Sequence, residues 1–336
     1  MKHYRIICPV GQGGFSIESI DNNYVVAYDC GSISSPEMVE LSIYHLKDWI
    51  NCIDVLFISH FDKDHVNVIR DLLSKIKVRQ AVTSYIPGEL KIAYNVYTDG
   101  AYSAVMTLLR QNEVGIREIG EWEDEPGRFT PPRAIWEWIA KSMMTNMDFR
   151  IIQSYLKAMD IYVDRLREPS YADEKKEIIN NAFKSVFGSK GPNSKGLIML
   201  SQPCEGTNTK RTDVICRRWP CLDVKRLKHE AESSCLYVGD ADLRNIANRK
   251  DVIAFLQRER TEDMLLFMQI PHHGSQNSIG KNFERFFPAL YYFVNDKSIN
   301  RIRKKSGLFA SLTRQKKLLV STNVCRDTIE SITEII

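Results

Sequence analysis

Three short apolar stretches that end in His or Asp constrain the fold of this chain more than any other feature of its sequence. Residues 54–59 (DVLFIS) stop at His60, residues 235–240 (CLYVGD) end in an acid, and residues 263–271 (DMLLFMQIP) stop at His272. An almost continuous apolar run of this length is typical of a strand buried on both faces. We therefore expect a buried sheet that carries its chemistry at the ends of its strands.

Other segments alternate between strand and helix patterns. Helices are predicted over 37–51, where apolar residues recur every three or four positions, and over 67–76. Further strands are predicted from β-branched and aromatic content over 4–10, 24–28, 79–86, 196–200, 289–294 and 316–322. Strands and helices that follow each other this closely are typical of α/β proteins.

The character of the chain changes over residues 95–190. Residues 133–187 are predicted to be mostly helical, because apolar and aromatic side chains recur at helical intervals, among them Trp136, Ile151, Met159 and Tyr162. We expect these stripes to be core. The prediction is therefore a single domain over 1–336 that carries a mostly helical insertion over 95–190.

Composition narrows the class of protein. Hydrophobic residues make up 43% of the chain and charged residues 26%, which fits a globular protein with a sizeable core and excludes a disordered or collagen-like chain. The longest apolar runs are far shorter than the roughly 18–20 residues of a membrane-spanning helix. Eight Cys at irregular spacings favour reduced thiols over a disulfide scaffold. We expect a soluble cytoplasmic protein with no membrane contact.

Two short motifs hold four of the seven His residues. The first gives four potential metal ligands within six residues, namely His60, Asp62, Asp64 and His65. A loop that leaves a strand end and enters a helix can direct several side chains into one cup. Imidazole nitrogens and carboxylate oxygens together suit Zn²⁺, Mn²⁺ or Fe²⁺. The second motif, Pro-His-His-Gly-Ser at 271–275, also follows an apolar strand.

These motifs resemble those of a known superfamily. His-x-Asp-x-Asp-His after a strand, a strand that ends in Gly-Asp, and Pro-His-His-Gly-Ser after another are similar to the metallo-β-lactamase fold. The closest branch is the one typified by the hydrolase domain of the competence protein ComEC. Further similarities to that branch are Val10-Gly11-Gln12-Gly13, Asp29-Cys30-Gly31 and Asn193 before a strand. The resemblance implies a four-layer αββα sandwich.

The resemblance also implies a centre of two divalent metal ions. Its ligands would be His60, Asp62, Asp64, His65, Asp240 and His273. Asp62 stands where most of the superfamily has a second His, and the His of the third motif is missing. The first site therefore has fewer nitrogen donors, which shifts its preference from Zn²⁺ towards Mn²⁺ or Mg²⁺. Asp64 and His273 would be the catalytic residues, with Asp64 orienting the attacking water.

The function implied is metal-dependent hydrolysis, with nuclease or phosphodiesterase action first. Two neighbouring ions can hold a hydroxide between them and neutralise charge on the phosphodiester that it attacks. Four side chains are candidates for contact with substrate: His272, Ser275, Ser278 and Lys63. Residues 297–317 carry eight Lys or Arg and no acid, and residues 210–228 carry seven, which suits DNA or RNA.

Two alternatives remain open. The same centre can hydrolyse a small ester, lactone or thioester, particularly if the 95–190 segment closes a pocket over it. The chain can also be a partner-gated enzyme or a non-catalytic scaffold whose 95–190 segment docks a protein. An exposed apolar patch on 133–187 would support a protein partner.

Overall fold

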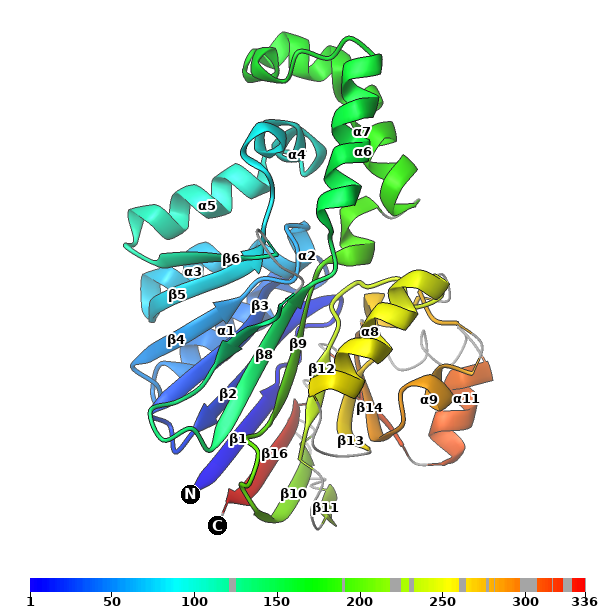
Figure 1. Ribbon diagram of the computed structural model, residues 1–336. Coiled ribbons are helices and arrows are strands. Elements are labelled where there is room, and N and C mark those ends of the chain that lie inside the picture. Colours follow the sequence, from blue (N-terminus) through cyan, green and yellow to red (C-terminus); the bar gives the residue numbers. More distant parts are fainter. Residues whose placement is uncertain are drawn as a thin grey trace.

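The computed structural model describes most of the chain in detail. The described residues are 1–120, 125–188, 191–217, 225–229, 233–259, 264–275, 278–280, 282–296, 307–315, 317–322 and 328–335. They form two sheets with helices on the outer sides (Figure 1). Much of the basic 297–317 segment, and residues 218–224 of the other basic segment, lie outside the described part.

Nine strands make up the first sheet within the described residues, in the order β11-β10-β16-β1-β2-β3-β4-β5-β6. Their bounds are β1 (Lys2–Ile7), β2 (Gly13–Ile20), β3 (Tyr24–Ser32), β4 (Cys52–Phe57), β5 (Lys77–Ser84), β6 (Gly115–Ile119), β10 (Thr209–Arg217), β11 (Lys225–His229) and β16 (Thr328–Ile335). The four strands β3, β4, β5 and β6 pair in parallel, and the others pair antiparallel.

Seven strands make up the second sheet in the same described part, in the order β15-β14-β13-β12-β9-β8-β7. Their bounds are β7 (Gly127–Phe129), β8 (Trp136–Ser142), β9 (Leu197–Pro203), β12 (Cys235–Tyr237), β13 (Leu265–Gln269), β14 (Ala289–Asp296) and β15 (Leu318–Thr322). Here β12, β13, β14 and β15 are the parallel strands. Each sheet thus contains one parallel half, as the apolar runs of β4 and β13 predict.

Three apolar clusters define four layers. One packs α1 (Pro36–Leu46), α3 (Ile69–Lys75) and α5 (Ala101–Gln111) on the outer face of the first sheet. A second fills the space between the sheets, and a third packs α8 (Ile246–Glu259), α9 (Phe283–Phe286) and α11 (Gly307–Arg314) on the outer face of the second sheet. The predicted α/β class and αββα sandwich are confirmed.

A group of helices projects from one end of the sandwich (Figure 1). It consists of η1 (Gly88–Leu90), α4 (Lys91–Tyr97), α6 (Asn146–Ala158), η2 (Val163–Arg167) and α7 (Pro169–Phe187), followed by η3 (Gly191–Lys195). Its inner side joins the same apolar cluster as the helices of the first sheet. Among the described residues, no helix combines the length and the apolar character needed to cross a membrane.

Helices make up most of the described residues of 95–190, and the correction concerns three strands within that segment. Residues 115–119, 127–129 and 136–142 are strands of the two main sheets, and helix resumes only at Asn146. Trp136, Trp138 and Ala140 face the core between the sheets, whereas Ile139 faces the opposite side. This two-residue alternation outweighs the three- and four-residue spacings on which the helix prediction depends. The extent of the single domain stays a prediction.

Two further corrections concern exposure and the sheet edge. Ile151, Met159 and Tyr162, predicted to be core, are about half exposed or more. The polar segment that follows β9 is a hairpin of β10 and β11, and it pairs with β16, a strand that the sequence reading missed. Because β16 also pairs with β1, both termini lie at the same end of the first sheet (Figure 1).

Candidate metal centre

The predicted ligands meet where the carboxyl ends of the parallel strands of both sheets come together. The loop after β4 carries His60 and Asp62 and leads into α2 (Lys63–Val66), which carries Asp64 and His65. The loop after β12 carries Asp240. Such strand ends are the usual place for ligands in α/β sheets. Three groups of these side chains have ligand atoms within 4.8 Å of one another: His60, His65 and Asp240; Asp64, His65 and His273; and His60, Asp62 and Asp64.

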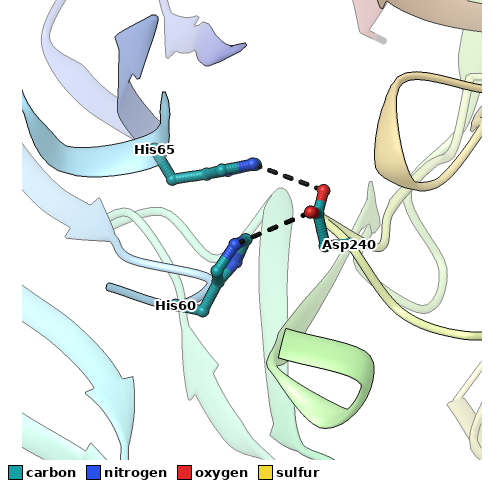
Figure 2. Close-up of side chains that lie close together, drawn as sticks. All are labelled: His60, His65 and Asp240. Carbon is teal, nitrogen blue, oxygen red and sulfur yellow. Dashed lines mark ion pairs between the residues drawn. The ribbon is translucent and has the colours of Figure 1, made fainter. Parts of the chain in front are cut away.

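The most buried group is His60, His65 and Asp240 (Figure 2). Nε2 of His65 lies 3.4 Å from Oδ1 of Asp240, and Nε2 of His60 lies 3.9 Å from Oδ2. The two imidazole rings approach each other with their centroids 4.1 Å apart. Both rings direct Nε2 towards the carboxylate, which comes from the other sheet.

Hydrogen bonds behind the two rings set their tautomers. Oδ2 of Asp29 lies 2.8 Å from Nδ1 of His65 and also accepts a bond of 2.8 Å from the Ser59 hydroxyl. The Ser59 Oγ, having given its proton to Asp29, accepts from Nδ1 of His60 at 2.9 Å. In their neutral forms both rings therefore carry the proton on Nδ1 and present a lone pair on Nε2. This is the way in which metal-binding His is usually oriented.

The resulting arrangement fits a cation. Nε2 of His60, Nε2 of His65 and Oδ1 of Asp240 are buried, and none has a hydrogen-bond partner among the described residues. Three acceptors that face one another without a donor are unfavourable unless a positive charge lies between them. A divalent ion that accepts nitrogen and oxygen ligands would satisfy all three.

In the second group, Asp64, His65 and His273, a hydrogen bond likewise orients the His ring. Nδ1 of His273 lies 3.2 Å from the carbonyl oxygen of Asn295, which can only accept, so Nδ1 carries the proton. Nε2 of His273 lies at hydrogen-bond distance from Oδ2 of Asp64, 3.0 Å, and a cation between the two atoms would take the place of the proton that they share. His65 belongs to both groups. Two cation sites that share His65 and lie beside each other are consistent with the predicted pair of ions.

Electrostatics within the cluster favour bound positive charge. Burial tends to raise the pKa of Asp64, but His65 and the hydrogen bond with His273 lower it to about 2. Burial likewise opposes ionisation of Asp240, yet the contact with His65 holds its pKa well below the usual range. Burial lowers the pKa of His65, but Asp29 and Asp64 outweigh it and raise the pKa well above its usual value, so the same acids that favour a proton on Nε2 would favour a metal cation in its place. The carboxylates are therefore ionised at neutral pH and attract a cation.

Asp62 joins the centre from the side of the projecting helices. It belongs to the group with His60 and Asp64, and its Oδ2 accepts a hydrogen bond from the side-chain amide of Asn193 in η3. Lys195, two residues further on, binds the Asp148 carboxylate of α6 at 2.9 Å. The segment between α7 and β9 therefore fixes Asp62 and the start of α6 at once.

The backbone around the site is held in uncommon conformations. His272, His273 and Gly274 all have positive φ, at 51°, 49° and 75°, which is rare for consecutive residues and typical of a functional turn. Gly14 allows a close approach, because a Cβ there would lie 2.9 Å from Oδ2 of Asp29 and 3.0 Å from Nδ1 of His65. A side chain at Gly14 would thus collide with the pair that orients His65.

The four residues predicted to contact substrate differ in their exposure to solvent. Nδ1 of His272 lies 3.2 Å from Oδ2 of Asp240 and its side chain is 34% exposed, so it borders both the centre and the solvent. Lys63 is exposed at the start of α2 and Ser275 is partly exposed, and their roles stay predictions. Ser278 is fully buried, which does not support direct contact with a substrate.

Sequence reasoning gave no role to three residues that position the ligands. Asp29 and Ser59 orient His65 and His60, and the Asn295 carbonyl orients His273. Asp29 was visible only as part of Asp-x-Gly, and Ser59 only as the residue before the first His. Asn295 gave no signal, because its backbone oxygen makes the contact and any residue would provide one.

No family model matches the chain, and no curated protein matches its sequence. Solved structures do resemble it. A new diphosphatase from the PhnP family is 8% identical, with a TM-score of 0.44 over 96% of this chain and 95% of that one. A mutant of the CmlA beta-hydroxylase is 10% identical, with a TM-score of 0.48 over 96% and 53%. The metallo-β-lactamase MIM-1 from Novosphingobium pentaromativorans is 10% identical, with a TM-score of 0.35 over 93% and 90%.

At identities of 8–10% and TM-scores below 0.5, these likenesses say nothing about the activity of this chain. The likeness to the ComEC branch stays a prediction. The His and Asp groups of this chain can hold divalent metal ions on their own geometry, and the identity of the metal is open.

Proposed function

We propose that this protein is a metal-dependent hydrolase that cleaves phosphodiester bonds in nucleic acid. The observation that carries the proposal is the first group, in which Nε2 of His60, Nε2 of His65 and Oδ1 of Asp240 converge with no donor among the described residues, beside a second group that shares His65. Divalent ions bound there would activate water at neutral pH and offset negative charge on the group attacked.

The side chains have separable tasks in this proposal. Asp64 stays ionised throughout the working pH range, because its pKa is held at about 2, and so it can orient a water molecule and accept its hydrogen bond. His273 is fixed through Asn295 and holds Asp64 in place. Asp240 spans the two imidazoles of the first group, so its carboxylate serves the centre from the second sheet.

Charge favours an anionic substrate. Two divalent ions would carry one positive charge more than the three carboxylates of Asp62, Asp64 and Asp240 together. Lys63 is exposed on α2 between two of these acids in the sequence, and His272 reaches the solvent on the other side. A phosphodiester would meet the positive charge of Lys63 and the imidazole of His272, and the basic segments 210–228 and 297–317 would extend the positive charge along a nucleic-acid backbone.

A small ester, lactone or thioester is the second candidate, and one observation favours it. His60, His65 and Asp240 are 5% exposed or less, so the first group lies below the surface of the protein. A small substrate reaches a deep centre more readily than a duplex does. In this reading Asp64 and His272, which are more exposed, would form the entrance.

The test is cleavage of end-labelled DNA and RNA, single- and double-stranded, by purified protein supplied separately with Mn²⁺, Mg²⁺ or Zn²⁺. We expect metal-dependent cutting that Asp64→Asn lowers by at least about 100-fold. The matched control is Asp164→Asn, an exposed acid in η2 that belongs to none of the three ligand groups. Protein that carries metal but cuts no polymer, while it hydrolyses model esters, would transfer the proposal to small molecules.

A further inference from the structure

The side-chain amide of Asn193 in η3 is satisfied on one of its two sides. Asn193 is 7% exposed, and its Nδ2 donates a hydrogen bond to Oδ2 of Asp62. Its Oδ1 is also buried and has no hydrogen-bond partner among the described residues. A buried amide oxygen without a donor is unfavourable, and most buried polar atoms in folded proteins have a partner. The described residues do not provide the positive partner that this oxygen requires.

The orientation of this amide is set by Asp62. A carboxylate only accepts hydrogen bonds, so it selects the NH₂ of Asn193. The reverse orientation would place the amide oxygen against a carboxylate oxygen, with two acceptors in contact. Because the oxygen and nitrogen of an amide are attached to the same carbon, Oδ1 lies close to the Asp62 carboxylate as well.

The chain just after Asn193 packs against the residue before His60. The Leu197 amide donates to the carbonyl oxygen of Ser59 at 2.8 Å. Gly196 allows this approach, since a Cβ there would lie 2.6 Å from the same oxygen and 3.7 Å from Cβ of His60. The segment that carries Asn193 is therefore held against the loop of the first ligands.

The residue after Asn193 is hydrogen-bonded to the loop of Asp240. The carbonyl oxygen of Ser194 accepts from the Asp242 amide at 3.1 Å. Asp242 follows Asp240 by two residues, and Asp240 supplies the carboxylate of the first group. Asn193 is therefore held between the ligand loops of the two sheets, as its contact with Asp62 also indicates.

An amide oxygen suits a hard divalent cation. Side-chain carbonyl oxygens of this kind bind ions such as Ca²⁺, Mg²⁺ and Mn²⁺, whereas Zn²⁺ depends more on nitrogen and sulfur ligands. Asn193 would add an oxygen ligand without adding negative charge beside Asp62 and Asp240.

We propose that Asn193 is a ligand of the cation site at His60, which two of the three ligand groups share. The amide oxygen faces the ion, and the amide nitrogen holds Asp62 beside it. The added oxygen shifts the preference of this site towards Mn²⁺ or Mg²⁺ and away from Zn²⁺. The proposal rests on the metal centre of the proposed function and is independent of the substrate.

The test measures metal binding to the full-length protein, with Asn193→Leu as the main variant. Leu fills the position but offers neither an oxygen nor an NH₂. We expect the affinity for Mn²⁺, measured from the electron paramagnetic resonance of the free ion, to fall at least about tenfold. The affinity for Zn²⁺ should fall less. The visible absorption of bound Co²⁺ should change, because it reports the number and arrangement of the ligands.

Asn193→Asp separates binding of the ion from the positioning of Asp62. The new carboxylate cannot donate to Asp62 but still offers an oxygen, so it should recover most of the Mn²⁺ affinity that Asn193→Leu loses. Asn245→Leu is the matched control. Oδ1 of Asn245 accepts from the Ala247 amide at 2.9 Å, so this oxygen is already satisfied and its loss should leave metal affinity unchanged.

The outcomes separate this proposal from the proposed function. Wild-type protein that binds no divalent ion would refute both. Wild-type protein that binds Mn²⁺, with equal affinity in Asn193→Leu, would overturn the role of Asn193 alone. Equal losses in Asn193→Leu and Asn193→Asp, or an unchanged Co²⁺ spectrum, would do the same, because Asn193 would then only hold Asp62. Circular dichroism verifies folding, and Asn193→Ala replaces a Leu variant that does not fold.

Discussion

Two clusters of buried polar side chains differ in how their donors and acceptors are matched. In the first, the Glu18 carboxylate lies between the sheets and receives hydrogen bonds from His3, Arg5, Trp138, Ser201 and Tyr237. These donors come from both sheets. In the second, the candidate metal centre, Nε2 of His60, Nε2 of His65 and Oδ1 of Asp240 converge without a donor among the described residues.

The difference separates a structural cluster from a functional one. Both clusters are almost fully buried, both contain His and a carboxylate, and burial alone does not tell them apart. Glu18 is satisfied by the protein itself, so it ties the two sheets together and leaves no position for a ligand. The centre around His65 is satisfied only when a cation is added. Donor and acceptor counts therefore distinguish the two where composition does not.

The largest effect is expected from removing the carboxylate of the structural cluster. Glu18→Ala leaves the Arg5 guanidinium buried without its ion-pair partner, which should lower the free energy of unfolding by about 3–5 kcal/mol. Denaturant unfolding measures this, with Glu40→Ala on the exposed side of α1 as the control. The folded fraction of Glu18→Ala should still bind metal. A variant that loses metal rather than stability would erase the distinction between the clusters.

The next largest effect is expected from acidification, which should weaken the structural cluster around Glu18. Burial lowers the pKa of His3 to about 4 from its ordinary value of 6.5, although Glu18 opposes this. The unfolded chain therefore binds a proton between pH 6.5 and 4 that the folded protein does not. Stability is fully present above pH 6.5 and falls by up to about 3 kcal/mol towards pH 4. The lowered pKa of Glu18 extends the loss below pH 4.5.

The pH prediction is checked by denaturant unfolding of metal-free protein between pH 4 and 8. His3→Gln removes the titrating group and should flatten the acid limb above pH 4.5. His45→Gln, which changes an exposed His on α1, should leave the wild-type profile intact. A profile that does not respond to His3→Gln would assign the acid sensitivity to other groups.

Removing bound metal should lower the free energy of unfolding through the candidate metal centre alone, and not through the Glu18 cluster. At a metal concentration 100 times the dissociation constant, binding adds about 2.7 kcal/mol to the free energy of unfolding, and a chelator removes it. Asp240→Asn should abolish this increment. Asp242→Asn should keep it, because Asp242 belongs to none of the ligand groups and its carboxylate accepts from the Arg244 amide. An equal chelator effect in both variants would place the metal elsewhere.

The sequence predicts the candidate ligands better than it predicts the strand pairing that brings them together. His60, Asp64, His65 and His273 follow apolar strands, and the structure brings them together because strand ends of both sheets meet there. What the sequence could not give is the pairing between distant strands. Ile151 and Met159 are exposed rather than core for a related reason, since periodicity shows that a helix has an apolar side and not what covers it.

The prediction of helix where the structure has strand β8 fails for a different reason. Trp136 to Ser142 contains apolar residues at both helical and strand spacings, and only the strand places Trp136 and Trp138 in the core between the sheets. Short apolar runs of this kind are ambiguous in sequence, and tertiary packing decides them. The missed strand β16 follows from the same limit, because its partner β1 lies at the far end of the chain.

The smallest predicted effect tests the residue that converts the second cluster into a ligand site. In Asp29→Asn the new amide can direct its NH₂ at Nδ1 of His65, which would move the ring proton to Nε2 and remove a lone pair from the centre. Metal affinity should fall by about 10- to 100-fold, as measured by competition with a chromophoric chelator.

Asp21→Asn is a closely matched control for Asp29→Asn. Both positions have positive φ, 47° at Asp21 and 57° at Asp29, so any backbone effect of the amide is shared. Within the described part of the chain, the Asp21 side chain accepts the Lys2 amide alone, at an exposed turn, so Asp21→Asn should leave metal affinity unchanged. Equal affinities in the two variants would mean that Asp29 merely supports the fold. A loss confined to Asp29→Asn would show that the lone pairs in this centre are set by the hydrogen bonds behind them.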